Sequence, residues 1–296
     1  MELTLPDPVG IARRRIETSV RSLLGGDDAP PPRPDREGDP GLFGPGSAVW
    51  QVHGDLATLV GGVRALLLQT LHPLAMAGVA EHSNYRSDPF GRLQRTAGFV
   101  ATTTFGTTAE AEQAVAVVRK VHERVQGVAP DGRHYAATDP HLLTWVHITE
   151  VDSFLRAHRR YGATPIDAHC ADRYVAEMAE VARRLGAEVP PTTVAELRTT
   201  LYAYRPELEL GAQARDAIRW LLAPPLPLTA RPPYALLTGA AIGLLPGWAR
   251  RLLWLPRPPL LDRVAVRPAT RATLGALGWA LGESPQARAA ADRVSA

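Results

Sequence analysis

An all-α protein with a single helical domain is what the amino-acid sequence predicts. Several segments repeat apolar residues every three or four positions, which is the period of a helix with one buried face. Capping residues and prolines precede many of these segments, and glycines follow others, as at helix ends. No stretch alternates apolar and polar residues well enough to indicate a sheet. With 296 residues, such a domain is large enough to enclose an organic cofactor.

The first 46 residues are expected to lie outside this domain, which we place at residues 47–296. Residues 9–24 set apolar side chains along one helical face with arginines among them, so they predict a short amphipathic helix. Residues 25–46 mix proline, glycine and aspartate, which neither hold a helix nor bury a core, and this indicates a loose arm. We expect the basic helix to pack on the protein; peripheral contact with a membrane is the alternative.

The first helices of the domain follow from their start and stop signals. Ser47 can cap a helix, and the segment from Asp55 is apolar almost all round, as a buried helix would be. His72 and Pro73 break or restart this segment. The polar cluster and proline at 87–89 mark a turn and the start of a new helix.

The later helices also begin at polar caps. Thr107 or Thr108, with glutamates in the first turn, starts a segment that Gly127 can close. Residues 138–140 start another helix, for which Gly162 is the expected stop. Further helices are expected at 173–185, 193–203, 211–222, 235–253 and 272–281.

Charge and cysteine content exclude several classes of protein. The net charge is +3, and the basic residues are nearly all arginine, since Lys120 is the single lysine. These arginines are scattered among acidic residues, so we expect no nucleic-acid partner. Cys170 is the only cysteine, which excludes an internal disulfide, a multi-cysteine zinc site and covalent heme attachment. We interpret it as a buried or incidental thiol.

The same features favour a cytoplasmic protein. A single cysteine fits a reducing compartment, and the N-terminal sequence has no apolar core of signal-peptide length. The longest apolar stretch, residues 234–246, is well short of the ~20 residues that a membrane-spanning helix needs.

Common catalytic motifs are not present in the sequence. It contains no phosphate-binding loop, no dinucleotide-binding glycine motif, no H-E-x-x-H and no G-x-S-x-G. None of the nine histidines has a glutamate three residues before it, so a ferritin-like di-iron centre is not expected.

The first candidate site residue is His122. On a helix it shares one side with Val115, Val118 and Val125, so its imidazole should project from the buried face. A buried imidazole needs a partner for its nitrogens. From the residues alone, a core histidine bonded to a backbone carbonyl is the favoured interpretation, and a metal ligand is the second.

The second candidate, His147, has the same two interpretations. It shares its side of a helix with Leu143, Val151 and Phe154, and Glu150 is near enough in sequence to orient it.

Arg92 and Thr96 are four residues apart on one predicted helix. Both therefore project from one face and can reach a shared anion or cofactor edge. The alternatives are a solvated surface arginine and a hydroxyl bonded back to the preceding turn. Arg95, beside this face, is interpreted as a solvated charge.

Two other histidines lie in or beside apolar sequence. His72, before a proline, is expected to hold carbonyls at a helix end, and His82 with Glu81 is expected to line a pocket. Histidines with polar or turn neighbours are expected on the surface: His134, His141, His158 and His169.

Three ordered motifs resemble the catalytic domain shared by latex-clearing proteins and MpaB oxygenases. They are GVRALLLQTLHPLAMAGVAEHSNYRSDPFGRLQRT, then H-x-x-V-x-G, then Y-A-A-T-D-P-x-L-L-x-W-V-H. The resemblance runs from about Trp50 to about Tyr161. It implies a helical fold that holds one noncovalent b-type heme, with His122 as the proximal iron ligand. It also implies that Arg92 and Thr96 line the heme pocket and that His147 lies close by.

The resemblance leaves the distal side of the heme undefined. Latex-clearing proteins carry a lysine just before the threonine, where this chain has Arg95. Arginine does not readily lose its proton to bind iron, so the distal side is expected to be open, water-filled or differently ligated. Glu81 is the nearest candidate for the distal acid of the family.

The activity implied by the resemblance is oxygenation. The family's known activities cleave carbon–carbon double bonds of isoprenoid chains, so dioxygen and an apolar, unsaturated small molecule are the expected partners. Residues 55–80 and 235–260 are rich enough in leucine, alanine and glycine to wall an apolar channel, or to form plain core. The alternatives are a heme protein that binds or senses without turnover, and a helical lipid-binding protein.

Overall fold

Helices account for nearly all regular structure in the described part of the chain, which confirms the all-α prediction. The computed structural model describes residues 38–83, 88–255 and 259–295, without the side chains of residues 89, 90 and 92. The amphipathic helix predicted at residues 9–24 lies outside the described residues. The main elements are α2 (Ala48–His53), α3 (Ala57–Gln69), α4 (Pro73–His82), α5 (Pro89–Phe105), α6 (Thr108–His122), β1 (Gln126–Val128), β2 (His134–Ala136), α7 (Pro140–Tyr161), α8 (Ala168–Leu185), α9 (Val194–Ala203), η1 (Arg205–Glu207), α10 (Ala212–Leu222), α11 (Arg231–Leu244), α12 (Gly247–Leu252), α13 (Pro259–Leu261), the π-helical turn η2 (Asp262–Val266), α14 (Arg267–Leu281) and α15 (Pro285–Ser295).

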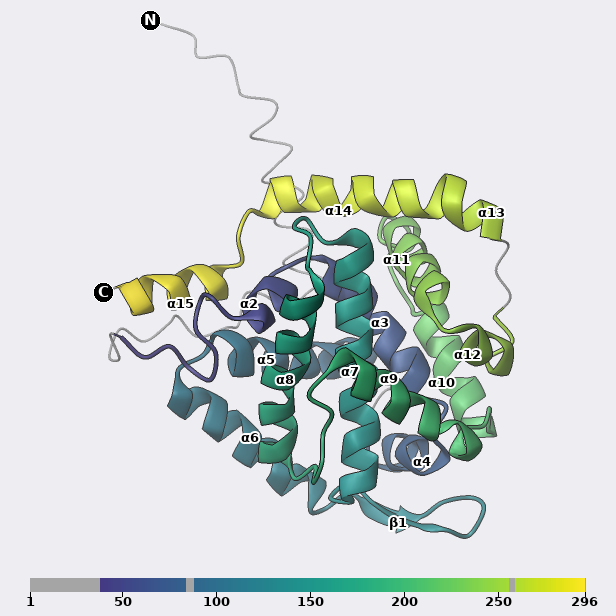
Figure 1. The fold of residues 1–296 in the computed structure, drawn as a ribbon. Helices are drawn as coiled ribbons and strands as arrows, with labels where there is room; N and C mark the ends of the chain where they lie inside the picture. Colours follow the sequence, from purple (N-terminus) through teal and green to yellow (C-terminus); the bar gives the residue numbers. More distant parts are fainter. Residues whose placement is uncertain (1–37, 84–87, 256–258, 296) are drawn as a thin grey trace, which may run out of the picture.

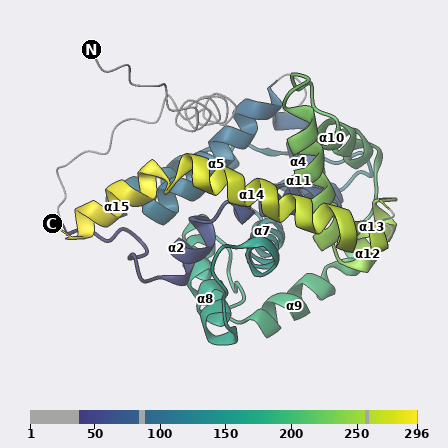
Figure 2. The same ribbon diagram turned by 90° about the horizontal axis from the view of Figure 1, so that it is seen from above.

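The core is built around the contact between α3 and α7. Helix α7 runs through the middle of the molecule, with α8 and α9 beside it and α3 behind it (Figure 1). Viewed from above, α14 crosses over this group, and α15 lies along α5 (Figure 2). Leu67, Leu68, Trp145 and Ile148 are fully buried where α3 meets α7. Residues of α11 join the same apolar cluster. The segments considered as walls of an apolar channel therefore contribute to the main core.

A buried ion pair crosses this core. The guanidinium of Arg64, which has no exposed surface, lies 2.7 Å from the carboxylate of Asp152. It also donates to the hydroxyl of Ser153 at 2.6 Å and to the carbonyl of Leu244 at 3.0 Å. Arg156, one turn further along α7, binds the other side of the same carboxylate at 2.8 Å. Because every charge has a partner, the pair is compatible with burial.

The predicted helix starts are confirmed at several caps. The side chains of Ser47, Asp88 and Asp139 each accept a backbone N–H in the first turn of α2, α5 and α7. Thr107 and Thr193 form capping boxes with the glutamates three residues later. These short-range hydrogen bonds are local, which is why the sequence alone predicts them.

Several element boundaries differ from the prediction, among them the start of α14, which is Arg267 rather than residue 272. Helix α6 ends at His122 rather than at Gly127, which lies instead in the antiparallel pair β1–β2. A Cβ atom on Gly127 would lie 2.7 Å from the Tyr135 hydroxyl, so the hairpin needs glycine there. The long helix expected at 235–253 is broken into α11 and α12 at Pro246. Helix α8 begins five residues before the expected start, capped by Asp167.

The described end of the predicted arm packs on the body of the protein. Asp39 binds the backbone N–H and hydroxyl of Thr108 at the start of α6. Arg293 of α15 donates to the carbonyl of Asp39 at 2.8 Å and to the carbonyl of Phe105 at 3.0 Å. Phe43 is buried in the main core. Residues 38–46, at the N-terminal end of the described chain, are thus held against α15 at its C-terminal end.

Among the described residues, no single helix combines the length and apolar character that crossing a membrane requires. Helices α3 and α4 reach that threshold only as a pair, and they are bent by 105° relative to each other.

Candidate functional site

Helix α6 carries His122 at its C-terminal end, on the face that packs against the protein. Val115, two turns earlier on that face, is buried, and His122 itself is half-buried. Its Nδ1 atom is enclosed and has no hydrogen-bond partner among the described residues. Burial lowers the pKa of His122 below its usual range, so the imidazole is neutral. The backbone-bonded interpretation does not hold for this nitrogen.

His147 presents the same combination on α7. It is buried, and its Nε2 atom is enclosed without a hydrogen-bond partner among the described residues. Burial, with a smaller contribution from the charge of Arg183 on α8, lowers the pKa of His147 to about 4. Because the Nε2 atom has no partner among the described residues, Glu150 does not hold this nitrogen.

Helix α5 carries Arg92 and Thr96 in its N-terminal half. Thr96 is exposed, and the side chain of Arg92 lies outside the described residues. Arg95 is also exposed and lies 3.2 Å from the carboxylate of Asp88, the cap of the same helix. This contact agrees with the interpretation of Arg95 as a solvated charge. The roles of Arg92 and Thr96 toward a cofactor stay predictions.

Glu81 is exposed at the end of α4 and is held by the hairpin. Its carboxylate accepts a short hydrogen bond from the hydroxyl of Tyr135 in β2, and His82 lies 3.1 Å from the same hydroxyl. Burial, followed by the bond to Glu81, raises the pKa of Tyr135 to about 12. Glu81 therefore ties α4 to the hairpin, and its role as a distal acid stays a prediction.

A cluster of buried and half-buried polar side chains draws on four helices and was not predicted from the sequence. His53 of α2 lies 2.8 Å from the hydroxyl of Thr104 on α5 and 3.0 Å from the hydroxyl of Tyr174 on α8. Burial lowers the pKa of His53 to about 3. On α7, burial raises the pKa of the half-buried Glu150 to about 7. Burial and the charge of Glu150 together raise the pKa of Tyr174.

One signal for His53 was available in the sequence. His53 follows Val49 by four residues, so the two share a helical face, and Val49 is fully buried. The partners of His53 lie 51 and 121 residues away, and no local pattern identifies them.

The expectation that His158 lies on the surface is wrong. Its side chain is only 1% exposed, and its Nδ1 atom lies 3.9 Å from the carboxylate of Asp55. A Cβ atom on Gly162 would lie 2.8 Å from this nitrogen, so the glycine that ends α7 leaves the space that His158 fills. The turn residues after His158 suggested exposure, but they cover it. His134, His141 and His169 are exposed, as predicted.

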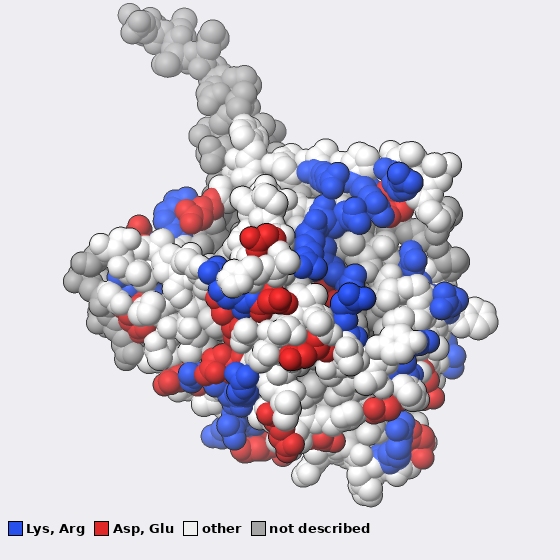
Figure 3. All heavy atoms as spheres, in the orientation of Figure 1, with Lys and Arg blue, Asp and Glu red and all other residues white. Residues whose placement is uncertain are grey.

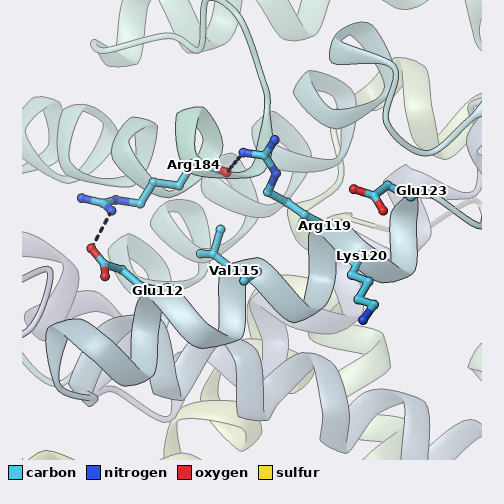
Figure 4. A pocket seen from close by; sticks show the side chains of 7 residues that line it. Glu112, Val115, Arg119, Lys120, Glu123 and Arg184 are labelled. Carbon is cyan, nitrogen blue, oxygen red and sulfur yellow. Dashed lines mark hydrogen bonds and ion pairs between the residues drawn. The ribbon is translucent and has the colours of Figure 1, made fainter.

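A hollow of about 580 Å³ lies between α6 and α8. Charged side chains line most of it: Glu112, Arg119, Lys120, Glu123 and Arg184 (Figure 4). Basic and acidic groups are intermixed over this part of the surface (Figure 3). Val115 and Ala116 supply its apolar lining, and His122 is not among the lining residues. A polar, charge-lined hollow of this kind does not match an apolar substrate.

Two histidines among the described residues have the properties that a ligand of heme iron needs. An iron ligand must be a neutral imidazole with an available nitrogen. His122 and His147 are both neutral, and each keeps an enclosed ring nitrogen without a partner. Such nitrogens are rare in folded proteins and call for a ligand, a metal or water.

A family model of known proteins matches this chain. The family described as ER-bound oxygenase mpaB/B'/Rubber oxygenase, catalytic domain, matches residues 50–279. This range is most of the 296-residue chain, and it extends well beyond the motifs between residues 50 and 161. No curated protein and no solved structure gave a significant match.

Proposed function

The chain belongs to the mpaB/rubber oxygenase catalytic-domain family, and from this premise we propose that it is a heme b-dependent oxygenase that acts on an apolar, unsaturated substrate. Membership of an oxygenase family supports an oxidoreductase. The dependence on heme, the residues that hold it and the substrate class are parts of the proposal. A cytoplasmic location likewise stays a prediction from the single cysteine.

The observation that carries the proposal is the state of His122. By its motif H-x-x-V-x-G it resembles the family's proximal histidine, burial lowers its pKa and so favours the neutral imidazole, and it keeps an enclosed nitrogen without a partner. In the proposal, this imidazole would hold the heme iron. Bound heme supplies the site for dioxygen binding and activation.

The other candidate residues would shape the pocket. Arg92 and Thr96 lie one turn apart on α5, so their side chains can serve the same edge of a cofactor. His147 is neutral at physiological pH, since its pKa is about 4, and it can offer a hydrogen bond or a lone pair within the protein. Glu150, with a pKa of about 7, can hold or release a proton near neutrality.

The proposed reaction needs no other reactant than dioxygen. Cleavage of one carbon–carbon double bond by one O₂ breaks the double bond and the O–O bond and forms two carbonyl groups. Both oxygen atoms enter the products, so no separate electron donor is consumed. An isoprenoid chain is the proposed substrate class because the family's known activities cleave such chains.

The test is product formation under labelled oxygen. The heme-replete protein is incubated with squalene, an unsaturated isoprenoid, under ¹⁸O₂, and carbonyl products are measured by mass spectrometry. The proposal expects ¹⁸O in both carbonyl products and their loss in His122→Ala. A protein that binds heme but forms no product from squalene or from other unsaturated chains would instead be a binding or sensing heme protein.

A further inference from the structure

Three metal-ligating side chains come together away from α6, although 135 residues of sequence separate the first from the last. They are His72, His141 and Glu207, and their ligand atoms all lie within 4.8 Å of one another. The Nε2 atom of His141 is 2.8 Å from the Glu207 carboxylate, and the Nε2 atom of His72 is 3.4 Å from the same oxygen. None of them belongs to the proposed heme site.

His72 is enclosed and has no hydrogen-bond partner for its ring. It is the residue before α4, at the sharp bend that follows α3, and only 1% of its surface is exposed. The rings of Trp145 and Tyr204 lie 6.0 and 6.2 Å from its own. Neither ring nitrogen makes a hydrogen bond within the described structure, and the Nε2 atom lies 3.4 Å from the carboxylate of Glu207.

The ring of His141 is positioned by its neighbour Tyr204. The Tyr204 hydroxyl donates to the backbone carbonyl of His141 at 2.8 Å, and its oxygen lies 3.2 Å from the Nδ1 atom of the ring. The Nε2 atom lies 2.8 Å from the carboxylate of Glu207. The ring therefore presents Nε2 to the cluster and keeps Nδ1 on Tyr204.

We propose that His72, His141 and Glu207 bind a zinc ion. Two imidazoles and one carboxylate are the ligand set of open zinc sites, in which a fourth position is left for water or another ligand. Ligand atoms around tetrahedral zinc are about 3.3–3.5 Å apart for bonds of about 2.0–2.1 Å. The observed 2.8 and 3.4 Å separations therefore need only small side-chain movements.

The zinc ion would link three segments of the chain and keep one coordination position open. His72 lies at the bend between α3 and α4, His141 in the first turn of α7, and Glu207 in η1. The side chains of His141 and Glu207 are 51% and 38% exposed, so the fourth position faces solvent. The Tyr204 hydroxyl holds the non-ligating nitrogen of His141, as partners of zinc-bound histidines do.

The test is a zinc titration of the full chain after treatment with a chelator, which leaves heme iron in place. We expect one Zn²⁺ per chain by calorimetry, and nitrogen and oxygen ligands with imidazole scattering at the zinc absorption edge, which iron does not disturb. His141→Gln and Glu207→Gln should each weaken binding at least tenfold. His134→Gln and His169→Gln, at exposed histidines, should leave the zinc affinity unchanged.

Because His72 is fully buried, the test relies on the exposed partners, whose substitution the fold should tolerate. Two results would overturn the proposal. One is a wild-type chain that stays folded by circular dichroism and binds no Zn²⁺. The other is equal zinc affinity in the wild type, His141→Gln and Glu207→Gln. Either would mean that a proton bridges His141 and Glu207.

Discussion

At the scale of single residues, hydrogen bonding separates the buried histidines into two groups. Both nitrogens of His53 have hydroxyl partners, which is what a structural core histidine requires. His72, His122, His147 and His158 each keep at least one enclosed nitrogen without a partner in the described chain. Leaving a buried polar atom unsatisfied costs about 1–3 kcal/mol. The Nδ1 atom of His158 lies 3.9 Å from the carboxylate of Asp55, and we assign the other three histidines, and not His53, to ligand binding.

Glu150 should make the stability of the protein depend on pH near neutrality. Burial raises its pKa to about 7, above the value of about 4.3 expected in the unfolded chain. A raised folded-state pKa contributes stability that is present below the unfolded value and lost as the pH rises through 7. The free energy of unfolding of Glu150→Gln, taken relative to that of the wild type, should therefore be higher at pH 8.5 than at pH 5, by on the order of 2 kcal/mol.

The measurement is urea unfolding at both pH values. Glu188→Gln, at an exposed glutamate, is the matched control and should follow the wild type. If Glu150→Gln kept the pH dependence of the wild type, the carboxyl would not be buried as described.

The ion pair of Arg64 and Asp152 should contribute strongly to the stability of the folded protein. Burial alone would raise the pKa of Asp152, but the charges of Arg64 and Arg156 outweigh it and lower the pKa. The stability from this group is therefore present above about pH 3.9 and is lost as the pH falls through the lower folded value. Asp152→Asn leaves Arg64 buried without a counter-charge and should cost about 3–5 kcal/mol in urea unfolding.

Arg156→Ala is the control for this pair. Its side chain is 44% exposed, so its loss should cost about 1 kcal/mol or less. Equal losses in Asp152→Asn and Arg156→Ala would contradict the account of a buried pair.

The sequence predicted single buried residues better than it predicted their partners. The spacing of His122 from Val115 placed it on the packed face of α6, and the structure agrees. The links from His53 to Tyr174 and from His72 to Glu207 join residues more than 100 positions apart. Such links depend on how helices pack, which no periodicity encodes.

At the scale of elements, a glycine allows α3 to approach α7. A Cβ atom on Gly61 would lie 2.6 Å from the ring of Phe154 and 3.0 Å from its Cα atom. The next residue, Gly62, has open space around its Cβ position. Gly61 is therefore needed for the close contact between the two helices, whereas Gly62 is not.

Gly61→Ala should push α3 and α7 apart and cost about 1–3 kcal/mol. Gly62→Ala should instead raise the free energy of unfolding by up to about 1 kcal/mol, because alanine has a higher helix propensity than glycine. Urea unfolding of the two variants compares them directly. A gain in both would show that the two helices are not in close contact at Gly61.

Element boundaries were predictable where a cap or a breaker acts locally. Asp88, Asp139 and Thr193 begin helices as predicted. The hairpin β1–β2 was missed because its strands have only three residues each, which is too short for a pattern of two to stand out in the sequence. Its position depends on the packing of Tyr135 against Gly127 and α4, which is a tertiary contact.

At the scale of the whole molecule, Arg293 joins the two ends of the described chain. Its guanidinium donates to the carbonyls of Asp39, Phe105 and Gly106. Arg293→Ala should lower the free energy of unfolding by on the order of 2 kcal/mol, since hydrogen bonds to a charged group are lost. It should also make the chain near Asp39 more susceptible to proteolysis. Arg288→Ala, at an exposed position of α15, should change neither, and equal effects of the two substitutions would contradict this role.

The measurement that tests the proposed function most directly is the heme content of the purified chain. The protein is produced in heme-replete cells, and a pyridine hemochrome assay and oxidised and reduced absorption spectra are recorded for the wild type, His122→Ala and His169→Ala. The account predicts one heme b per chain in the wild type and His169→Ala and its loss in His122→Ala. A wild type without a Soret band after heme reconstitution, or a His122→Ala variant with full heme content and an unchanged iron spectrum, would contradict it.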